Sequence, residues 1–275
     1  MQRISLNKED VLHQITLPKT RSAIQKTNWL IRYCRISHII LHTLVGIFIT
    51  AVMLPLVKKP AKLRLISWWC RHLLTAFNIR IVSKGHIPPR TTLSNTMFVG
   101  NHVSWADIHA LNSIVPVKFI AKSEIKNWPI FGYLAKVNAL FIDRTKRHDA
   151  ARVVNVTVQS LQAGDNLCLF PEGTTTDGTE MKSFKSSLIQ AAIQARSTIW
   201  PVAIRYPNPD GSINTAMAYA GDITLPESLQ AALLQKNPVV ELTFLQPILV
   251  NDELAKDRRA LTLHIEQLIR QELNL

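Results

Sequence analysis

The sequence has few cysteines and lacks the short motifs that mark common metal and hydrolase sites. Cys34, Cys70 and Cys168 are an odd set without paired spacing, which favours reduced thiols in a cytosolic setting over disulfides. Neither HExxH nor CxxC occurs, so the sequence implies no structural or catalytic metal. G-x-S-x-G is also absent, which leaves a serine-hydrolase mechanism without its nucleophile motif.

Acidic residues are scarce relative to basic ones. The 275 residues carry a formal net charge of +13, with 47% hydrophobic residues and a mean hydropathy of +0.08. A chain of this length fills a sizeable core and still has apolar surface to spare for a membrane. The positive charge suits an anionic membrane surface or nucleic acid. Because no zinc-finger spacing, basic-region heptad or RNA-binding aromatic motif accompanies it, we expect no nucleic-acid partner.

One apolar run is long enough to form a membrane helix. Residues 39–57 contain His42 as their only ionisable group, and at about 1.5 Å per residue they cover roughly 28 Å. Residues 61–79 mix basic, apolar and tryptophan side chains, as in a helix that lies in the membrane interface. A single span and a helical hairpin in one leaflet fit equally well, and a buried core helix is the alternative. A cleaved signal peptide is disfavoured, because thirty-eight residues precede the run.

From residue 80 onward, strand and helix patterns alternate. This alternation predicts an α/β fold with a mostly parallel sheet flanked by helices, and two regions: a basic N-terminal segment, 1–79, and a domain, 80–275. The expected strands are 79–85, 96–100, 117–122, 139–143, 166–170, 200–206, 216–220 and 239–250; the expected helices are a segment ending near 132, and 107–115, 150–163, 186–195 and 252–273.

His102 and Asp107 lie five residues apart, directly after the expected strand 96–100. A histidine with a carboxylate that orients it can take a proton from a hydroxyl at neutral pH. Residues five apart point in different directions on a continuous helix, so the two pair only if the intervening segment is not helical. The alternative is that Asp107 only caps the next helix and His102 is a satisfied loop histidine. Ser104 fits a helix cap better than a nucleophile.

Four sequence blocks follow the order and spacing of one family. They are NHVSWAD (101–107), ALFIDR (139–144), FPEGTTTDG (170–178) and WPVAI (200–204). Together they resemble the motif blocks of the glycerolipid acyltransferases, of which lysophosphatidic acid acyltransferases are the best-known members. The resemblance covers roughly residues 80 to 210 and implies that family's α/β fold with a membrane-associated helical segment at the N-terminus.

The resemblance implies that His102 is the general base and Asp107 its orienting partner, with no acyl-enzyme. It implies that Arg144 grips the phosphate of the acceptor, for which a guanidinium fork is well suited; a surface arginine paired with Asp143 is the alternative. Lys122 is a candidate second charge at this site, or a solvated lysine.

Glu172, Gly173 and Thr174 belong, by the same resemblance, to the acceptor site. A free carboxylate beside a phosphate is repulsive, so Glu172 is expected to hold Arg144 or another cation rather than to touch phosphate. The alternative is a structural glutamate bonded within its own turn. Backbone amides of the NHVSWAD turn or of residues 172–174 are the candidate donors to the oxyanion.

Three departures from the commonest family pattern bear on the acceptor. Asn138 stands where glycine is usual, Thr175 where arginine often follows, and Ser187 where glycine is more usual. With these residues, the sequence resembles more closely the branch of the family that acylates lyso-ornithine lipids and other lysolipids.

The expected activity is O-acyl transfer from acyl-CoA or acyl carrier protein, as co-substrate and without a bound cofactor, to the hydroxyl of lysophosphatidic acid or a related lysolipid. The expected location is the inner membrane, among membrane lipids and with the catalytic domain facing the cytoplasm. The alternatives are a noncatalytic lipid-binding membrane protein and a thioesterase.

Overall fold

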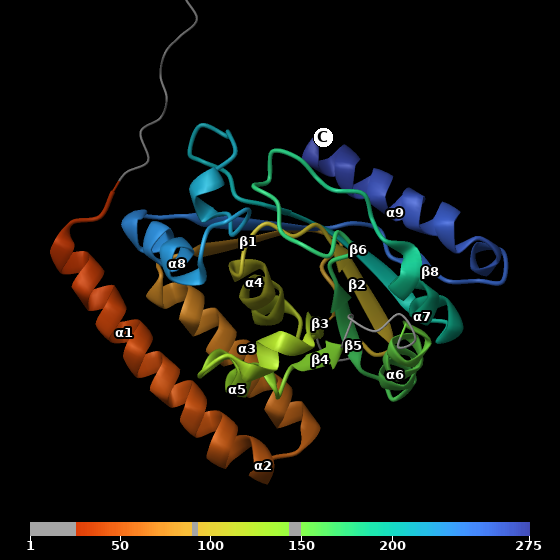
Figure 1. Cartoon of the computed structure of the whole chain (residues 1–275), viewed down its shortest axis with the longest axis horizontal. Coiled ribbons are helices and arrows are strands. Elements are labelled where there is room, and N and C mark those ends of the chain that lie inside the picture. Colours follow the sequence, from red (N-terminus) through yellow and green to blue (C-terminus); the bar gives the residue numbers. More distant parts are fainter. Residues whose placement is uncertain (1–25, 90–92, 143–149) are drawn as a thin grey trace, which may run out of the picture.

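The computed structural model describes residues 26–89, 93–142 and 150–275, which form a mixed sheet with helices on both faces (Figure 1). The sheet order is β1-β7-β6-β2-β5-β3-β4, with β8 paired to β6. The strands are β1 (Arg80–Gly85), β2 (Thr96–Gly100), β3 (Lys118–Lys122), β4 (Ala139–Ile142), β5 (Asn166–Leu169), β6 (Thr198–Arg205), β7 (Val239–Phe244) and β8 (Ile248–Leu249).

The helices fall into three groups. An N-terminal group precedes the sheet: α1 (Trp29–Phe48), a π-helical turn η1 (Ile49–Met53), α2 (Leu54–Leu56) and α3 (Lys59–Ala76). The connections between strands contain α4 (Ala106–Ile114), η2 (Ser123–Asn127), α5 (Phe131–Ala135), α6 (Ala150–Gln162), η4 (Ser186–Leu188), α7 (Ile189–Gln194), η5 (Thr215–Met217) and α8 (Leu225–Leu234). The chain ends in η6 (Leu254–Lys256) and α9 (Arg258–Leu273).

The α/β prediction is confirmed, because most strand pairs are parallel. β2 pairs in parallel with both β5 and β6, β3 pairs in parallel with β4 and β5, and β1 with β7. The antiparallel pairs are β6–β7 and β6–β8. The carboxyl ends of β2, β5 and β3 therefore lie along one edge of the sheet, where open α/β sheets place their binding sites.

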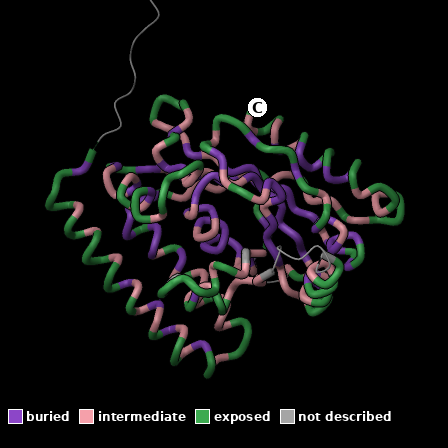
Figure 2. The backbone as a smooth tube through the Cα atoms, viewed as in Figure 1, coloured by how far each residue is buried: buried purple, intermediate pink, exposed green. Residues whose placement is uncertain are grey.

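The sheet separates two hydrophobic cores, and β2 contributes to both. Phe98 packs into the core on the α3, α4 and α8 side, whereas Met97 and Val99 pack into the core on the α6, α7 and α9 side. All five residues of β2 are buried, so this strand runs through the middle of the molecule (Figure 2). A strand buried on both faces holds its carboxyl end in a fixed position.

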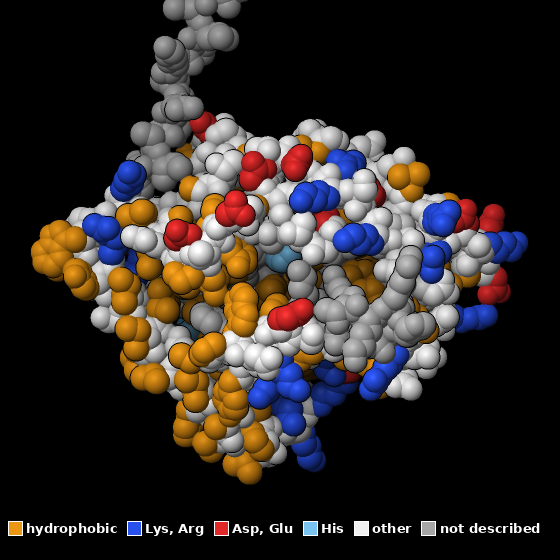
Figure 3. Space-filling view, in the orientation of Figure 1, with side chains coloured by type: hydrophobic (Ala, Val, Ile, Leu, Met, Phe, Trp, Pro, Cys, Tyr) orange, Lys and Arg blue, Asp and Glu red, His pale blue; other side chains and the backbone are white. Residues whose placement is uncertain are grey.

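The apolar N-terminal helix is longer than the sequence pattern predicts. Helix begins at Trp29 rather than near Ile39, because the side chain of Asn28 caps it by accepting a bond from the Ile31 N–H at 2.9 Å. Within the described residues, one helix, Trp29–Leu56, is long and apolar enough to cross a membrane. Large apolar side chains on it are exposed and cover one flank of the molecule (Figure 3).

The second N-terminal helix, α3, turns back along α1 and enters the core. Leu73, Leu74 and Phe77 at its carboxyl end are buried against α4, whereas Arg64 and Trp68, earlier in the helix, are exposed. The arrangement is a helical hairpin, and the predicted interfacial helix therefore also serves as a cover for the sheet. The division of the chain at residue 79 stays a prediction.

Three sequence predictions of local structure were wrong. Residues 216–220 do not form a strand: Met217, the end of a 3-10 turn, and Ala218 are buried, and the Tyr219 N–H bonds the Val103 carbonyl at 2.8 Å. The last helix begins at Arg258, capped by Asp257, rather than at Asp252. Residues 123–132 contain a 3-10 turn and the start of the short helix α5 rather than one continuous helix.

α1 and α3 contact each other through a glycine, a histidine and a tryptophan. The His42 and Trp69 rings stack with centroids 5.3 Å apart, and each side chain donates to the other's backbone carbonyl, at 2.9 and 3.1 Å. Gly46 lies one turn further along α1, where a Cβ atom would lie 2.4 Å from Trp69 Nε1. The helices approach this closely only because residue 46 has no side chain.

We therefore predict that Gly46→Ala destabilises the detergent-solubilised protein by about 1–3 kcal/mol, because the Trp69 ring must move and lose its bond to His42. Helix propensity alone predicts the opposite sign, a gain of about 1 kcal/mol. Thermal unfolding of the variant decides between the two, with Ser37→Ala on the exposed face of α1 as the control. An unchanged or raised melting temperature for Gly46→Ala would show that the α1–α3 contact is loose.

Candidate active site

The candidate site begins where β2 ends and the chain turns into α4. Asn101 extends the pairing of β2 with β6 by side-chain bonds: its Nδ2 donates to the Ile204 carbonyl at 2.9 Å, and the Ile204 N–H donates to its Oδ1 at 2.8 Å. Residues 101–104 are not helical, and α4 starts at Ala106. This short irregular segment allows His102 and Asp107 to face each other.

Asp107 is fully buried and organises the whole turn. Its Oδ2 accepts bonds from His102 Nδ1 at 2.8 Å, from the Val103 N–H at 2.8 Å and from the Ser104 N–H at 2.9 Å. Burying a carboxylate is costly unless it is fully hydrogen-bonded, and here the bonds come from the turn that the carboxylate shapes. Asp107 therefore both orients the imidazole and fixes the loop that holds it.

Tyr206 supplies a further donor that the sequence did not reveal. Its hydroxyl donates to Asp107 Oδ1 at 2.6 Å, and its side chain is 1% exposed. Burial and the neighbouring carboxylate raise the pKa of Tyr206 well above its ordinary value, so it remains a protonated donor. Tyr206 directly follows β6. It belonged to the expected strand 200–206, but the sequence pattern did not indicate that it bonds to Asp107.

The His102 ring is held on its face as well as at its edge. It stacks on Phe170 with centroids 4.0 Å apart and an interplanar angle of 7°, and its side chain is 18% exposed. Because Nδ1 bonds to Asp107, Nε2 is the ring nitrogen available to a substrate. The ring thus has one fixed orientation and one reactive atom.

Glu172 braces the same turn from the loop after β5. Its Oε1 accepts the His102 N–H at 2.8 Å, and its Oε2 accepts the Lys182 N–H at 3.0 Å. Burial raises the pKa of Glu172, although the two N–H donors act in the opposite direction. Both oxygens are bonded to backbone, so in the described residues Glu172 ties two loops together. Its predicted contact with Arg144 stays a prediction.

Of the other residues predicted for the acceptor site, the structure describes Gly173, Thr174 and the backbone of Lys122. Gly173 has a φ of +76°, which allows the tight turn in which its N–H bonds the Phe170 carbonyl, and Thr174 next to it is exposed. Lys122 ends β3, at the same edge of the sheet as His102. Arg144 lies outside the described residues.

Ser104 is not placed to act as a nucleophile. It is fully buried, and its Oγ accepts a bond from the Ala106 N–H at 3.4 Å, as expected of a residue that supports the start of a helix. In the described ranges, no group of three or more His, Cys, Asp or Glu side chains could hold a metal ion.

The loop amides show which donors remain for a developing negative charge. The N–H groups of His102, Val103 and Ser104 all bond to buried carboxylates, and the N–H of Gly173 bonds to Phe170. Of the amides that the sequence suggested, those of Glu172 and Thr174 in the second loop make none of these bonds. Phe170 stands within a recognisable block, but its stacking on His102 needed the tertiary structure.

Comparisons with known proteins identify the family. A family model described as Acyltransferase matches residues 78–205. A lyso-ornithine lipid O-acyltransferase from Pseudomonas aeruginosa is 34% identical over 77% of this chain and 79% of that protein. A 1-acyl-sn-glycerol-3-phosphate acyltransferase from Neisseria gonorrhoeae is 35% identical over 64% of this chain and 69% of that protein.

A solved structure shares the fold. The crystal structure of a 1-acyl-sn-glycerophosphate acyltransferase from Thermotoga maritima superposes with a TM-score of 0.61 at 19% identity, covering 87% of this chain and 96% of that one. The family model and the two relatives confirm the family and enzyme class expected from the sequence. The chain belongs to the acyltransferase family that includes lyso-ornithine lipid and 1-acyl-sn-glycerol-3-phosphate O-acyltransferases.

Proposed function

We propose that this acyltransferase moves a fatty acyl chain from a thioester donor, acyl-CoA or acyl carrier protein, to the hydroxyl of a lysolipid, with His102 as the general base. The observation that carries the proposal is the 2.8 Å bond between His102 Nδ1 and the buried Asp107 carboxylate. A bond of this kind keeps Nε2 free of its proton and aimed at an acceptor. The chemistry calls for no bound cofactor.

The reaction proceeds by direct attack. His102 Nε2 takes the proton of the acceptor hydroxyl while the hydroxyl oxygen bonds to the thioester carbonyl carbon. The carbon–sulfur bond then breaks, and the departing thiolate receives the proton from His102. The buried position of Ser104 favours this route over one through an acyl-enzyme.

The charge that develops on the carbonyl oxygen needs fixed donors. The amides of Glu172 and Thr174 are our candidates, since their loop is tied to the backbone of His102 through the Glu172 carboxylate. Thr174 is exposed at the same edge of the sheet, where its hydroxyl is open to the acceptor. Arg144 and Lys122 are proposed to supply positive charge to the acceptor headgroup.

The enzyme is proposed to work at the inner membrane, held by the α1–α3 hairpin, with the sheet on the cytoplasmic side. Support comes from the exposed apolar side chains of α1, among them Leu41, Leu44 and Phe48 (Figure 3). The cysteines, all free in the structure, fit a reducing compartment.

His102→Ala is expected to lower kcat by about 10² to 10⁴, because the base that activates the hydroxyl is lost. Transfer of labelled acyl groups by the detergent-solubilised protein measures this, and membrane association and the circular-dichroism spectrum serve as controls. Substantial activity in a correctly folded variant would remove His102 from the proposed role.

Tyr206→Phe is expected to shift the pH profile as well as the rate. Without the hydroxyl, the Asp107 carboxylate holds a proton on the imidazole more strongly, so the acidic limb of kcat/KM moves to higher pH. The lost bond to a charged group also costs about 10- to 100-fold in rate. Tyr33→Phe, an exposed tyrosine on α1, is the matched control. A uniform loss of rate with an unmoved limb would indicate a merely structural tyrosine.

The acceptor is identified by comparing lysophosphatidic acid with a lyso-ornithine lipid. If Arg144 binds a phosphate, Arg144→Ala raises KM for lysophosphatidic acid by about 10- to 100-fold and leaves saturation by the donor unchanged. Arg152→Ala, an exposed arginine on α6, should change neither constant. An Arg144→Ala effect confined to the donor would contradict the phosphate assignment, and a preference for the lyso-ornithine lipid would assign the site to a different headgroup.

A further inference from the structure

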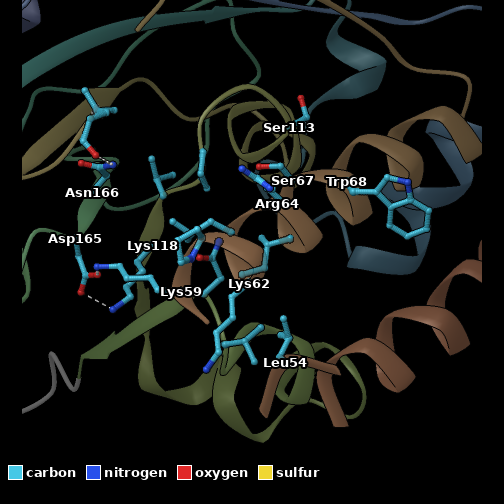
Figure 4. A pocket seen from close by; sticks show the side chains of 18 of the residues that line it. Leu54, Lys59, Lys62, Arg64, Ser67, Trp68, Ser113, Lys118, Asp165 and Asn166 are labelled. Carbon is cyan, nitrogen blue, oxygen red and sulfur yellow. Dashed lines mark hydrogen bonds and ion pairs between the residues drawn. The ribbon is translucent and has the colours of Figure 1, made fainter. Parts of the chain in front are cut away.

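A cavity of about 1260 Å³ lies at the end of the sheet opposite His102. Its walls are α2, α3, the residues before β3 and β5, and Val137 and Asn138 before β4 (Figure 4). His102 follows the carboxyl end of β2, whereas Lys118 and Asn166 in this cavity stand at the amino ends of parallel strands. The cavity is therefore separate from the proposed acyl-transfer site.

The lining of the cavity is strongly cationic. Five basic side chains line it, those of Lys59, Lys62, Arg64, Arg71 and Lys118. Among the described lining residues, Asp165 supplies the one carboxylate.

Asp165 neutralises only part of this charge. It pairs with Lys59 at 2.9 Å and with Lys118 (Figure 4). Burial alone would raise the pKa of Asp165, but its bonds to Lys118 and Lys59 outweigh burial and lower it, so the carboxylate stays ionised at neutral pH. The Arg71 guanidinium donates to the Ser113 carbonyl at 2.9 Å. Lys62 and Arg64 make no ion pair within the described part of the chain.

Apolar side chains complete the cavity and continue onto the surface. Leu54, Leu63 and Ile66 line it together with the basic residues. Leu54 belongs to the same apolar helix as Phe48 and Leu56, which are 56% and 80% exposed. In Figure 3 basic side chains gather beside this apolar flank. Cationic groups at the edge of an apolar surface match a phospholipid, whose phosphate lies next to its acyl chains.

We propose that this cavity binds the headgroup of an anionic bilayer phospholipid, with Lys62 and Arg64 on the phosphate and the α2–α3 turn beside the acyl chains. The lipid is a resident of the membrane and not the acyl acceptor, because the cavity is at the opposite end of the sheet from His102. Asp165 pairs with Lys59 of the hairpin and with Lys118 of β3, so the cavity lies where the hairpin meets the sheet. A lipid bound here would also hold the hairpin against the sheet. The proposal is independent of which lysolipid is acylated.

The test measures thermal stability of the full-length protein in neutral detergent micelles doped with phosphatidylglycerol or phosphatidylcholine. A ligand that binds only the folded state raises the melting temperature, by an amount that grows with the logarithm of its concentration relative to its dissociation constant. We expect phosphatidylglycerol to stabilise the wild type more than phosphatidylcholine does. The double variant Lys62→Gln/Arg64→Gln should need about tenfold more phosphatidylglycerol for the same rise in melting temperature.

Two further variants separate a specific site from bulk charge. Lys256→Gln/Arg259→Gln removes the same charge near the start of α9, remote from the hairpin, and should respond to phosphatidylglycerol like the wild type (Figure 1). Lys62→Arg/Arg64→Lys keeps the charge and should retain the response. An equal loss of the phosphatidylglycerol response in Lys256→Gln/Arg259→Gln would overturn the proposal. So would an equal rise in the melting temperature of the wild type with both lipids.

Two other ligands are distinguished by the same samples. Inorganic phosphate that reproduces the stabilisation would mean a free-anion site instead of a lipid site. A raised KM for the acyl donor in Lys62→Gln/Arg64→Gln, measured without anionic lipid, would mean a donor site. Unchanged kcat and KM with loss of the phosphatidylglycerol response would support the proposal. The lipid test does not depend on the proposed role of His102. The His102→Ala variant keeps the cavity, so its melting temperature should still respond to phosphatidylglycerol when it transfers no acyl groups.

Discussion

The site depends on one buried carboxylate, Asp107, that accepts four hydrogen bonds. Two come from the backbone of its own turn, one from the His102 ring and one from Tyr206 at the end of β6. An unpaired carboxylate in this position would cost several kcal/mol, so the loop, the ring and the strand end adopt the arrangement that satisfies it. The bonds that make burial tolerable are thus also the ones that aim the imidazole.

Glu172 extends the same principle to the second loop of the site. It is buried, and its two oxygens bond the backbone at His102 and Lys182, which places the loop after β5 at a fixed position beside His102. Backbone amides that point into a site are useful only when their loop does not move. Glu172, which the sequence assigned to the acceptor site as a partner for a cation, with a structural glutamate as the alternative, therefore ties two loops together within the described residues.

The N-terminal hairpin is joined to this framework through α3. The carboxyl half of α3 contributes Leu73, Leu74 and Phe77 to the core beneath α4, the helix that carries Asp107, while its amino half is basic and only partly buried. One helix thus has a protein-facing part and a surface-facing part. The N-terminal hairpin and the sheet are therefore packed together through α3.

The sequence by itself determined the alternation of strands and helices, the mostly parallel character of the sheet and the family, because these depend on local periodicity and on short motifs. It named His102 and Asp107 as a possible pair, and the structure showed that the segment between them is irregular enough to let them bond. Only the tertiary structure decided that Tyr206 donates to Asp107 and that Glu172 accepts from His102. Those partners are 99 and 70 residues apart, and they meet because β2 lies between β5 and β6 in the sheet. The prediction of a strand at 216–220 was wrong for the same reason: a short apolar run indicates burial, and what covers the segment is set by distant parts of the chain.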